Sequence, residues 1–176
     1  MGVAFNLGIS AETALAATLL VSLLAAGGCA PMHQDAAQRA LAAGRYDDAA
    51  NEIEAALAHD PDSLQLKKLA GQIYTQRGVA EYNDQQMLAA GDDFHRAINY
   101  DPFNSRPYDY LGMLAFQRHA WADAIQYGNK AASMAGKPDP DYVKSARREL
   151  LKQQSGGFEP YLRPGQRPPL PQGPSF

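Results

Sequence analysis

The sequence predicts an all-α protein, and three observations lead to that fold class. Alanine is abundant between residues 36 and 135 while β-branched residues are sparse there, which favours helix over strand. Small residues recur in phase along the same stretch, as closely packed helices require. Prolines and glycines interrupt the chain at intervals that suit helices of ordinary length. The 176 residues suffice for one domain.

Charge and cysteine content narrow the possible functions. The chain carries 16 basic and 19 acidic residues, for a formal charge of −3. Its basic residues are scattered rather than gathered in a stripe, so no nucleic-acid partner is expected. A single cysteine, Cys29, excludes an internal disulfide.

The first 28 residues contain an uncharged apolar run, Thr13–Ala26. As a helix it would rise about 21 Å, short of the roughly 30 Å hydrocarbon core, so a signal-peptide core fits better than a membrane span. The run ends in Ala26-Gly27-Gly28-Cys29, which resembles the lipobox of bacterial lipoproteins, although Ala26 replaces the commoner leucine and residues 1–12 lack Lys and Arg.

The lipoprotein resemblance implies that residues 1–28 are a signal peptide and that Cys29 is lipidated on sulfur as the mature amino terminus. The residue after Cys29 is Ala30 rather than Asp. By the same analogy, this implies a location at the outer membrane, facing the periplasm. The alternatives are a signal peptide without lipidation, or a wrongly assigned start of the chain, with Cys29 buried by chance.

An internal repeat organises residues 30–136. Asp60-Pro61 and Asp101-Pro102 each precede a glycine, Gly71 or Gly112, with the same ten-residue spacing between proline and glycine. Glycine inside a helix costs about 1 kcal/mol relative to alanine, so Gly71 and Gly112 indicate close helix crossings.

These residues resemble the signature of the tetratricopeptide repeat (TPR), a helix–turn–helix unit of about 34 residues. The resemblance implies an α-solenoid of about three such units plus a C-terminal capping helix, together residues 29–154. The matching positions are Ala37, Ala49, Ile53, Ala56 and Pro61 in the first unit, Gly71, Ala90, Phe94, Ala97 and Pro102 in the second, and Gly112, Ala124, Gly128, Ala131 and Gly136 in the third. Gly128 departs from the aromatic or apolar residue of the pattern, and Gly136 departs from its proline.

The second unit is seven residues longer than the standard repeat, with the surplus expected near Val79–Gln85. A longer loop is the favoured interpretation, and lengthened helices or a ledge beside the groove are alternatives. Gly44 and Gly78 are expected to end the first helix of their units. The predicted helices are 34–43, 46–59, 63–80, 86–99, 107–117, 121–135 and 140–153.

The last predicted helix has the character of a solenoid cap. Asp139 is expected as its N-cap and Pro140 as its first residue. The apolar face comprises Tyr142, Val143, Ala146, Leu150 and Leu151, and the basic residues Lys144, Arg147, Arg148 and Lys152 are expected to be solvated.

Residues 155–176 are rich in proline and glycine and are predicted to be disordered with polyproline II tendency. Within them "RPPLP" resembles ligands of aromatic-lined grooves. A spacer is the simpler interpretation. Five apolar residues leave open a docking segment, including one that reaches back into this protein's own groove: Phe158, Tyr161, Leu162, Leu170 and Phe176.

No catalytic constellation is found, so neither an enzyme nor a cofactor or small-molecule substrate is predicted. The four histidines, His33, His59, His95 and His119, are spread along the chain, and no pair has the spacing of a metal-binding helix.

The TPR resemblance implies that the first helix of each unit lines a concave peptide-binding groove. The residues at the groove-facing positions suit an extended or helical peptide. They are Lys68, Gln72, Thr75 and Gln76 in the second unit and Arg106, Asp109, Met113, Phe116 and Gln117 in the third. For Met113 and Phe116, packing on the capping helix is an equal alternative. The carboxylate clamp of the family is not assigned, because Gln72 stands where it needs Asn.

These expectations combine into a lipid-anchored interaction adaptor of the bacterial envelope that holds a protein or peptide partner. Its architecture resembles small TPR lipoproteins of type IV or tight-adherence pilus assembly. The alternative is an accessory binder of a cell-wall (peptidoglycan) enzyme.

Overall fold

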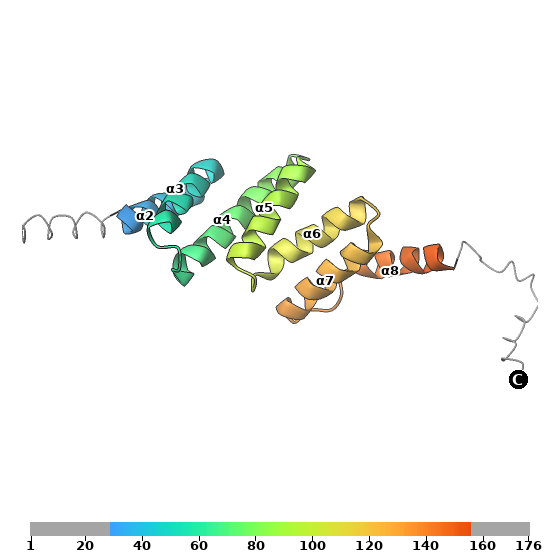
Figure 1. Ribbon diagram of the computed structural model, residues 1–176. Helices are drawn as coiled ribbons and strands as arrows, with labels where there is room; N and C mark the ends of the chain where they lie inside the picture. The colour runs from blue at the N-terminus through green and yellow to red at the C-terminus, as the bar shows by residue number, and fades with distance from the viewer. Residues whose placement is uncertain (1–28, 156–176) are drawn as a thin grey trace, which may run out of the picture.

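The computed structural model describes residues 29–155, which form seven α-helices joined by short turns (Figure 1). No strand occurs in this range, so the predicted fold class is confirmed. None of these helices is both long and apolar enough to cross a bilayer. The predicted signal segment and all but the first residue of the predicted tail lie outside the described residues. The helices are α2 (Cys29–Ala42), α3 (Tyr46–His59), α4 (Leu64–Asn83), α5 (Met87–Tyr100), α6 (Ser105–Gln117), α7 (Trp121–Ala135) and α8 (Asp141–Gln154).

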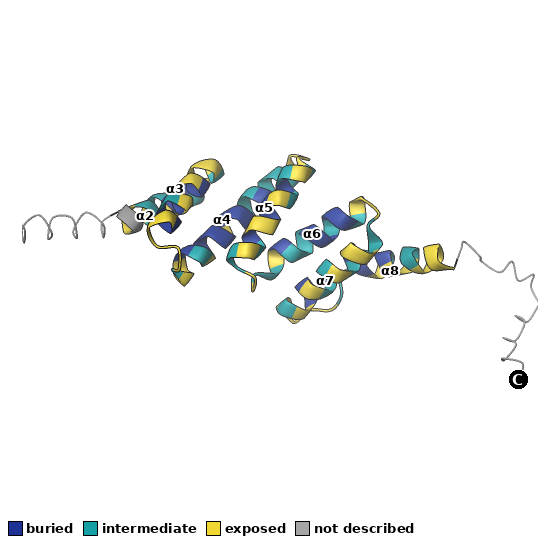
Figure 2. Cartoon of the chain, in the orientation of Figure 1, coloured by how far each residue is buried: buried dark blue, intermediate teal, exposed yellow. Residues whose placement is uncertain are grey.

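The helices pair into three hairpins, α2/α3, α4/α5 and α6/α7, which stack in sequence order (Figure 1). The second helix of each hairpin packs on the first helix of the next, and α8 packs on α7. The first helices also contact one another in series, α2 with α4, α4 with α6, and α6 with α8. This row forms one face of the predicted solenoid, and the buried residues lie between neighbouring helices (Figure 2).

The small residues of the repeat occupy the helix crossings. Ala49, Ala56, Ala90 and Ala97 are fully buried. A Cβ at Gly71 would lie 2.7 Å from the Cβ of Asp101 and 3.3 Å from the carbonyl oxygen of Ala97, at the end of α5. Since real Cβ atoms do not approach other carbons so closely, this crossing requires glycine.

The three hairpin turns are built alike. Gly44, Gln85 and His119 each adopt positive φ, at 70°, 62° and 60°. The amide of the following residue donates to the carbonyl five residues back, at 2.9 Å from Arg45 to Ala40, 2.8 Å from Gln86 to Glu81 and 2.9 Å from Ala120 to Ala115. Gly44 therefore ends its helix as expected.

The prediction for Gly78 is wrong, because this residue lies inside α4. A Cβ there would lie 2.9 Å from Cε1 of the Phe94 ring, so Gly78 makes the same kind of close crossing with α5 that Gly71 makes. The helix α4 thus carries two crossing glycines one heptad apart.

The seven surplus residues lengthen α4, so the favoured longer loop is wrong. The helix α4 has 20 residues and α6 has 13, while the hairpin connections 43–45, 84–86 and 118–120 are equally long. Seven helical residues fall only about 20° short of two full turns, so the packing face keeps its direction. The surplus extends the helix by about 10.5 Å along its axis.

The two halves of α4 serve different hydrophobic clusters. Leu66, Leu69 and Ile73 in its first half are buried with residues of α2 and α3. Val79 and Tyr82 in its second half pack on a cluster that includes Phe94 and residues of α6. The first half therefore packs on the first hairpin as well as on the end of α5, while the second half packs on α5 and α6.

The capping helix α8 fills space that glycines leave open. Val143 and Ala146 are fully buried. A Cβ at Gly112 would lie 3.0 Å from Cε2 of Tyr142, and one at Gly128 would lie 3.1 Å from the same atom. The cap thus inserts side chains where Ile53 and Phe94 stand in the first two units, and this explains why Gly128 departs from the repeat pattern.

The capping helix differs from the prediction in several details. The helix begins at Asp141 with Pro140 as its N-cap residue, and Asp139 instead pairs with Arg147 at 2.8 Å. Leu151 is 64% exposed and does not belong to the buried face. Lys144 and Lys152 are exposed, as expected, and form pairs of i,i+3 spacing with Asp141 and Glu149.

Candidate functional site

An open groove of about 560 Å³ runs between the first helices of the first two hairpins. Two predicted residues, Gln72 and Gln76, line it from α4, and Gln38 and Leu41 line it from α2. Gln38 and Leu41 are not among the predicted groove residues, although they hold the same repeat positions in the first unit as Gln72 and Thr75 hold in the second. The lining residues are Gln38, Leu41, Ala42, Gly44, Tyr46, Leu69, Gln72 and Gln76.

The groove is uncharged and combines amides with apolar side chains. A glutamine amide both donates and accepts hydrogen bonds, so it can pair with the N–H and the C=O of an extended peptide. Half-buried Leu41 offers apolar surface for a side chain between those polar contacts, and the buried Leu69 lies beneath it. This combination suits backbone recognition of a peptide segment and offers no countercharge to a charged ligand.

The other two predicted residues of α4 lie differently. Lys68 is exposed on α4 but does not line this groove. Thr75 is only 3% exposed, and its hydroxyl donates to the Gly71 carbonyl at 2.6 Å and accepts from the Asn104 amide at 3.3 Å. Thr75 therefore belongs to the interior, where it joins α4 to the turn before α6.

Two predicted residues of α6 contact the cap. The Asp109 carboxylate accepts a hydrogen bond from the Tyr142 hydroxyl at 2.9 Å. Burial, followed by this carboxylate, raises the pKa of Tyr142. The Phe116 ring lies 5.3 Å from the Trp121 ring and 6.2 Å from that of Tyr142, centroid to centroid. Asp109 and Phe116 therefore help to seat α8.

The remaining residues of α6 lie on its half-buried or exposed surface. The Gln117 amide donates to the Tyr82 hydroxyl at 2.8 Å, which bridges α6 to α4. The Arg106 guanidinium lies 5.9 Å from the Tyr110 ring centroid, and Met113 is half-buried. Of the nine predicted groove residues, Gln72 and Gln76 line the α2/α4 groove, Lys68 lies exposed outside it, Thr75 is buried, and the other five lie on α6, where several contact neighbouring helices.

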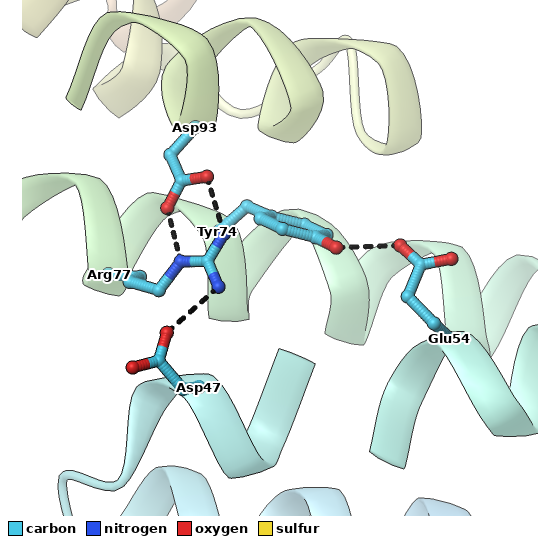
Figure 3. A network of polar contacts seen from close by, with 5 residues as sticks. All are labelled: Asp47, Glu54, Tyr74, Arg77 and Asp93. Carbon is cyan, nitrogen blue, oxygen red and sulfur yellow. Dashed lines mark hydrogen bonds and ion pairs between the residues drawn. The ribbon is translucent and has the colours of Figure 1, made fainter. Parts of the chain in front are cut away.

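A polar network holds the first two hairpins together (Figure 3). The Arg77 guanidinium donates to the Asp93 carboxylate at 2.6 and 2.7 Å and to Asp47 at 3.1 Å, which joins α3, α4 and α5. The Tyr74 hydroxyl donates to Glu54 at 2.7 Å, and burial together with this bond raises the pKa of Tyr74 to about 12. The network fixes α4 against α3, and with it the position of the groove wall.

An acid-lined hollow adjoins this network at the hairpin-turn edge, with Asp47, Asp48, Glu81 and Asp84 among its lining residues. Burial, reinforced by Asp93, raises the pKa of the Glu81 carboxyl above its ordinary value. Within residues 29–155, no three or more His, Cys, Asp and Glu side chains are grouped to hold a metal ion.

Comparisons with known proteins concern the fold. No family model and no curated protein matches the sequence. The Sgt2 TPR domain from Aspergillus fumigatus is similar at 19% identity and a TM-score of 0.44, with 74% of this chain and 85% of that chain covered. The MamA protein is similar at 16% identity and a TM-score of 0.34, with 78% of this chain and 100% of that chain covered.

Proposed function

We propose that this protein is an interaction adaptor that binds an extended, largely uncharged peptide segment of a partner protein in the α2/α4 groove. The observation that carries the proposal is the uncharged groove itself, in which Gln38 faces the same space as Gln72 and Gln76. Three amides on two neighbouring helices offer paired donors and acceptors to a peptide backbone, and half-buried Leu41 provides an apolar anchor point.

The proposal places the adaptor at the outer membrane, facing the periplasm, held by lipid on Cys29. Support comes from the apolar run Thr13–Ala26 and the small residues that precede Cys29. In that setting the protein holds a component of an envelope assembly, such as a pilus machine, close to the membrane.

The anchor is tested by fractionating cells that express the full chain or its Cys29→Ser variant. The wild type is expected in the outer-membrane fraction and labelled by a fatty-acid analogue, and the variant in the periplasmic fraction without label. Unlabelled wild type, or a variant that stays with the membrane, contradicts the anchor but leaves the groove proposal standing.

The groove is tested by crosslinking and affinity capture from native membranes. The triple variant Gln38→Ala, Gln72→Ala and Gln76→Ala is expected to lose at least about 90% of the captured partner, because it removes the polar backbone contacts. The matched control replaces three exposed amides away from the groove, Asn99, Gln153 and Gln154, with alanine and is expected to capture normally. Equal capture by both variants would exclude the groove.

The identity of the captured protein separates the two settings that the sequence leaves open. A pilus or secretion component supports the assembly role, and a peptidoglycan hydrolase or synthase supports the cell-wall alternative.

A further inference from the structure

Another hollow, of about 600 Å³, lies on the third hairpin, and its composition differs from that of the groove. It is lined by Tyr108 from α6 and by Gln126, Tyr127, Asn129 and Lys130 from α7. We call these five residues the tyrosine pocket. They combine two aromatic rings with amide and ammonium donors, and none of them is a carboxylate.

Neighbouring side chains hold the tyrosine pocket in place. The Tyr108 hydroxyl donates to the Pro102 carbonyl at 3.3 Å, and the Lys130 ammonium lies 5.8 Å from the Tyr108 ring centroid. The Tyr127 ring meets the His95 ring edge-on at 6.3 Å. Both tyrosines are half-buried, so their rings present a fixed, partly shielded surface rather than free side chains.

Asn129 faces the pocket with a defined amide orientation. Arg147 of α8 donates to its Oδ1 at 3.0 Å. Because a guanidinium only donates hydrogen bonds, the amide oxygen must face Arg147, and the NH₂ group is left to donate elsewhere. Arg147 is itself held by Asp139 at 2.8 Å. The pocket therefore offers hydrogen-bond donors beside flat aromatic surface.

That chemistry is complementary to a proline-rich segment. Proline residues have no backbone N–H, so the prolines of such a segment only accept hydrogen bonds through their carbonyls, and their rings pack against aromatic side chains. The chain contains one such segment that is free of charge, Pro168-Pro169-Leu170-Pro171, in the residues that follow α8. We propose that this segment docks in the tyrosine pocket of its own chain.

The position of α8 makes this contact reachable. The Arg147–Asn129 hydrogen bond places the middle of α8 beside the pocket, and Gln154, seven residues on, ends the helix about 10 Å along its axis. Twelve residues, 156–167, separate Ser155 from Pro168 and span about 37 Å when extended. A linker that exceeds the required distance gives an effective concentration on the order of millimolar, so a weak intrinsic affinity suffices.

The tyrosine pocket lies closer to the end of α8 than the α2/α4 groove does, and it is therefore the more accessible site for this segment. The groove lies on the first two hairpins, at the far end of the row from α8 (Figure 1). The docked segment therefore leaves the groove open for a partner.

The test uses the full chain in a Cys29→Ser background, where two introduced cysteines are the only thiols. The pair Gln126→Cys and Leu170→Cys should form an intramolecular disulfide under mild oxidation at least about tenfold faster than the control pair Gln38→Cys and Leu170→Cys. Mass spectrometry of the digested monomer identifies the linkage. Equal rates for the two pairs overturn the proposal, and a disulfide-linked dimer as the main product shows docking between copies and overturns it as well.

A tail variant separates docking from random collision. Replacing Pro168, Pro169 and Pro171 with serine keeps the linker length and lies outside the described helices, so helix content by circular dichroism should not change. The Gln126→Cys and Leu170→Cys pair should then react several-fold more slowly than it does with the prolines in place, because only the proximity given by the linker remains. An unchanged fast rate would mean that the prolines do not drive the contact, which overturns the proposal.

Discussion

The Arg77→Met variant gives the most direct measure of how the first two hairpins are joined. Asp93 lies at 5% side-chain exposure and Arg77 at 19%, and the two groups form a bidentate pair. Removing the cation leaves a buried carboxylate without its partner, which in other proteins costs about 3–5 kcal/mol. Asp47 adds little, because its side chain is 88% exposed. We therefore expect Arg77→Met to lower the free energy of unfolding by about 3–5 kcal/mol.

The assay is urea unfolding followed by far-ultraviolet circular dichroism, with Arg45→Met as the matched control. Arg45 pairs with Asp48 at 2.8 Å, but both side chains are more than half exposed, so its loss should cost less than about 1 kcal/mol. The double variant Arg77→Met with Asp93→Leu should recover most of the lost stability, because no charge is left buried. Equal losses for Arg77→Met and Arg45→Met, or no recovery in the double variant, would refute this reasoning.

Three further predictions follow from the turns, the cap and the buried acid. Gln85→Gly should raise the free energy of unfolding by about 0.5–1 kcal/mol by relieving the positive φ, and Gly44→Gln should lower it by about 1 kcal/mol, both measured by urea unfolding. Gly128→Leu should displace the cap by overpacking against Val143, seen as faster amide exchange in α8 and a loss of about 1–3 kcal/mol; protected α8 amides would contradict this packing. Burial raises the pKa of the Glu81 carboxyl in the folded state above its pKa in the unfolded state. The protein therefore loses stability as the pH rises from the unfolded-state pKa through the folded-state pKa, because the carboxyl then ionises in a buried position. Glu81→Gln should therefore stabilise the protein at neutral pH and not at low pH, and a stability gain independent of pH would refute it.

The helices were predictable because local signals and packing agree. In each second helix the alanines that face the crossing also favour helix formation, and the turns carry proline or a residue with positive φ at fixed spacing. The side-chain partners were not predictable in the same way. Arg77, Asp93 and Glu54 belong to three different helices, and only the stacked hairpins bring them into one network.

The groove residues, like the helices, were predictable only as far as local sequence positions determine them. Repeat positions identify one face of α4, and Gln72 and Gln76 do line an accessible groove. Repeat positions do not show which residues of that face are covered by a neighbour. Thr75 is buried by the turn before α6, and Asp109 and Phe116 are engaged by α8. These neighbours are set by the length of α4 and by the insertion of the cap, which a position-by-position alignment does not contain.

The lengthened α4 explains both the misplaced surplus and the shape of the site. In the repeat pattern, the number of residues that follow the proline at residue 61 identifies Gly71 as the crossing glycine. The number of residues that precede the turn at Gln85 identifies Gly78 instead. Both assignments hold, because seven residues return the helix to nearly the same orientation after two turns. The first heptad then covers the first hairpin and presents Leu69 and Gln72 beside α2, so the groove exists where one helix serves two hairpins. Deleting one heptad, residues 72–78, removes Arg77 and one of the two crossing glycines but should keep the helix faces on either side of the deletion in phase. Deleting four residues, 74–77, also removes Arg77 but should turn the face by about 40° and unfold the second hairpin. Similar stability of the two deletions would show that α4 does not set the register of the stack.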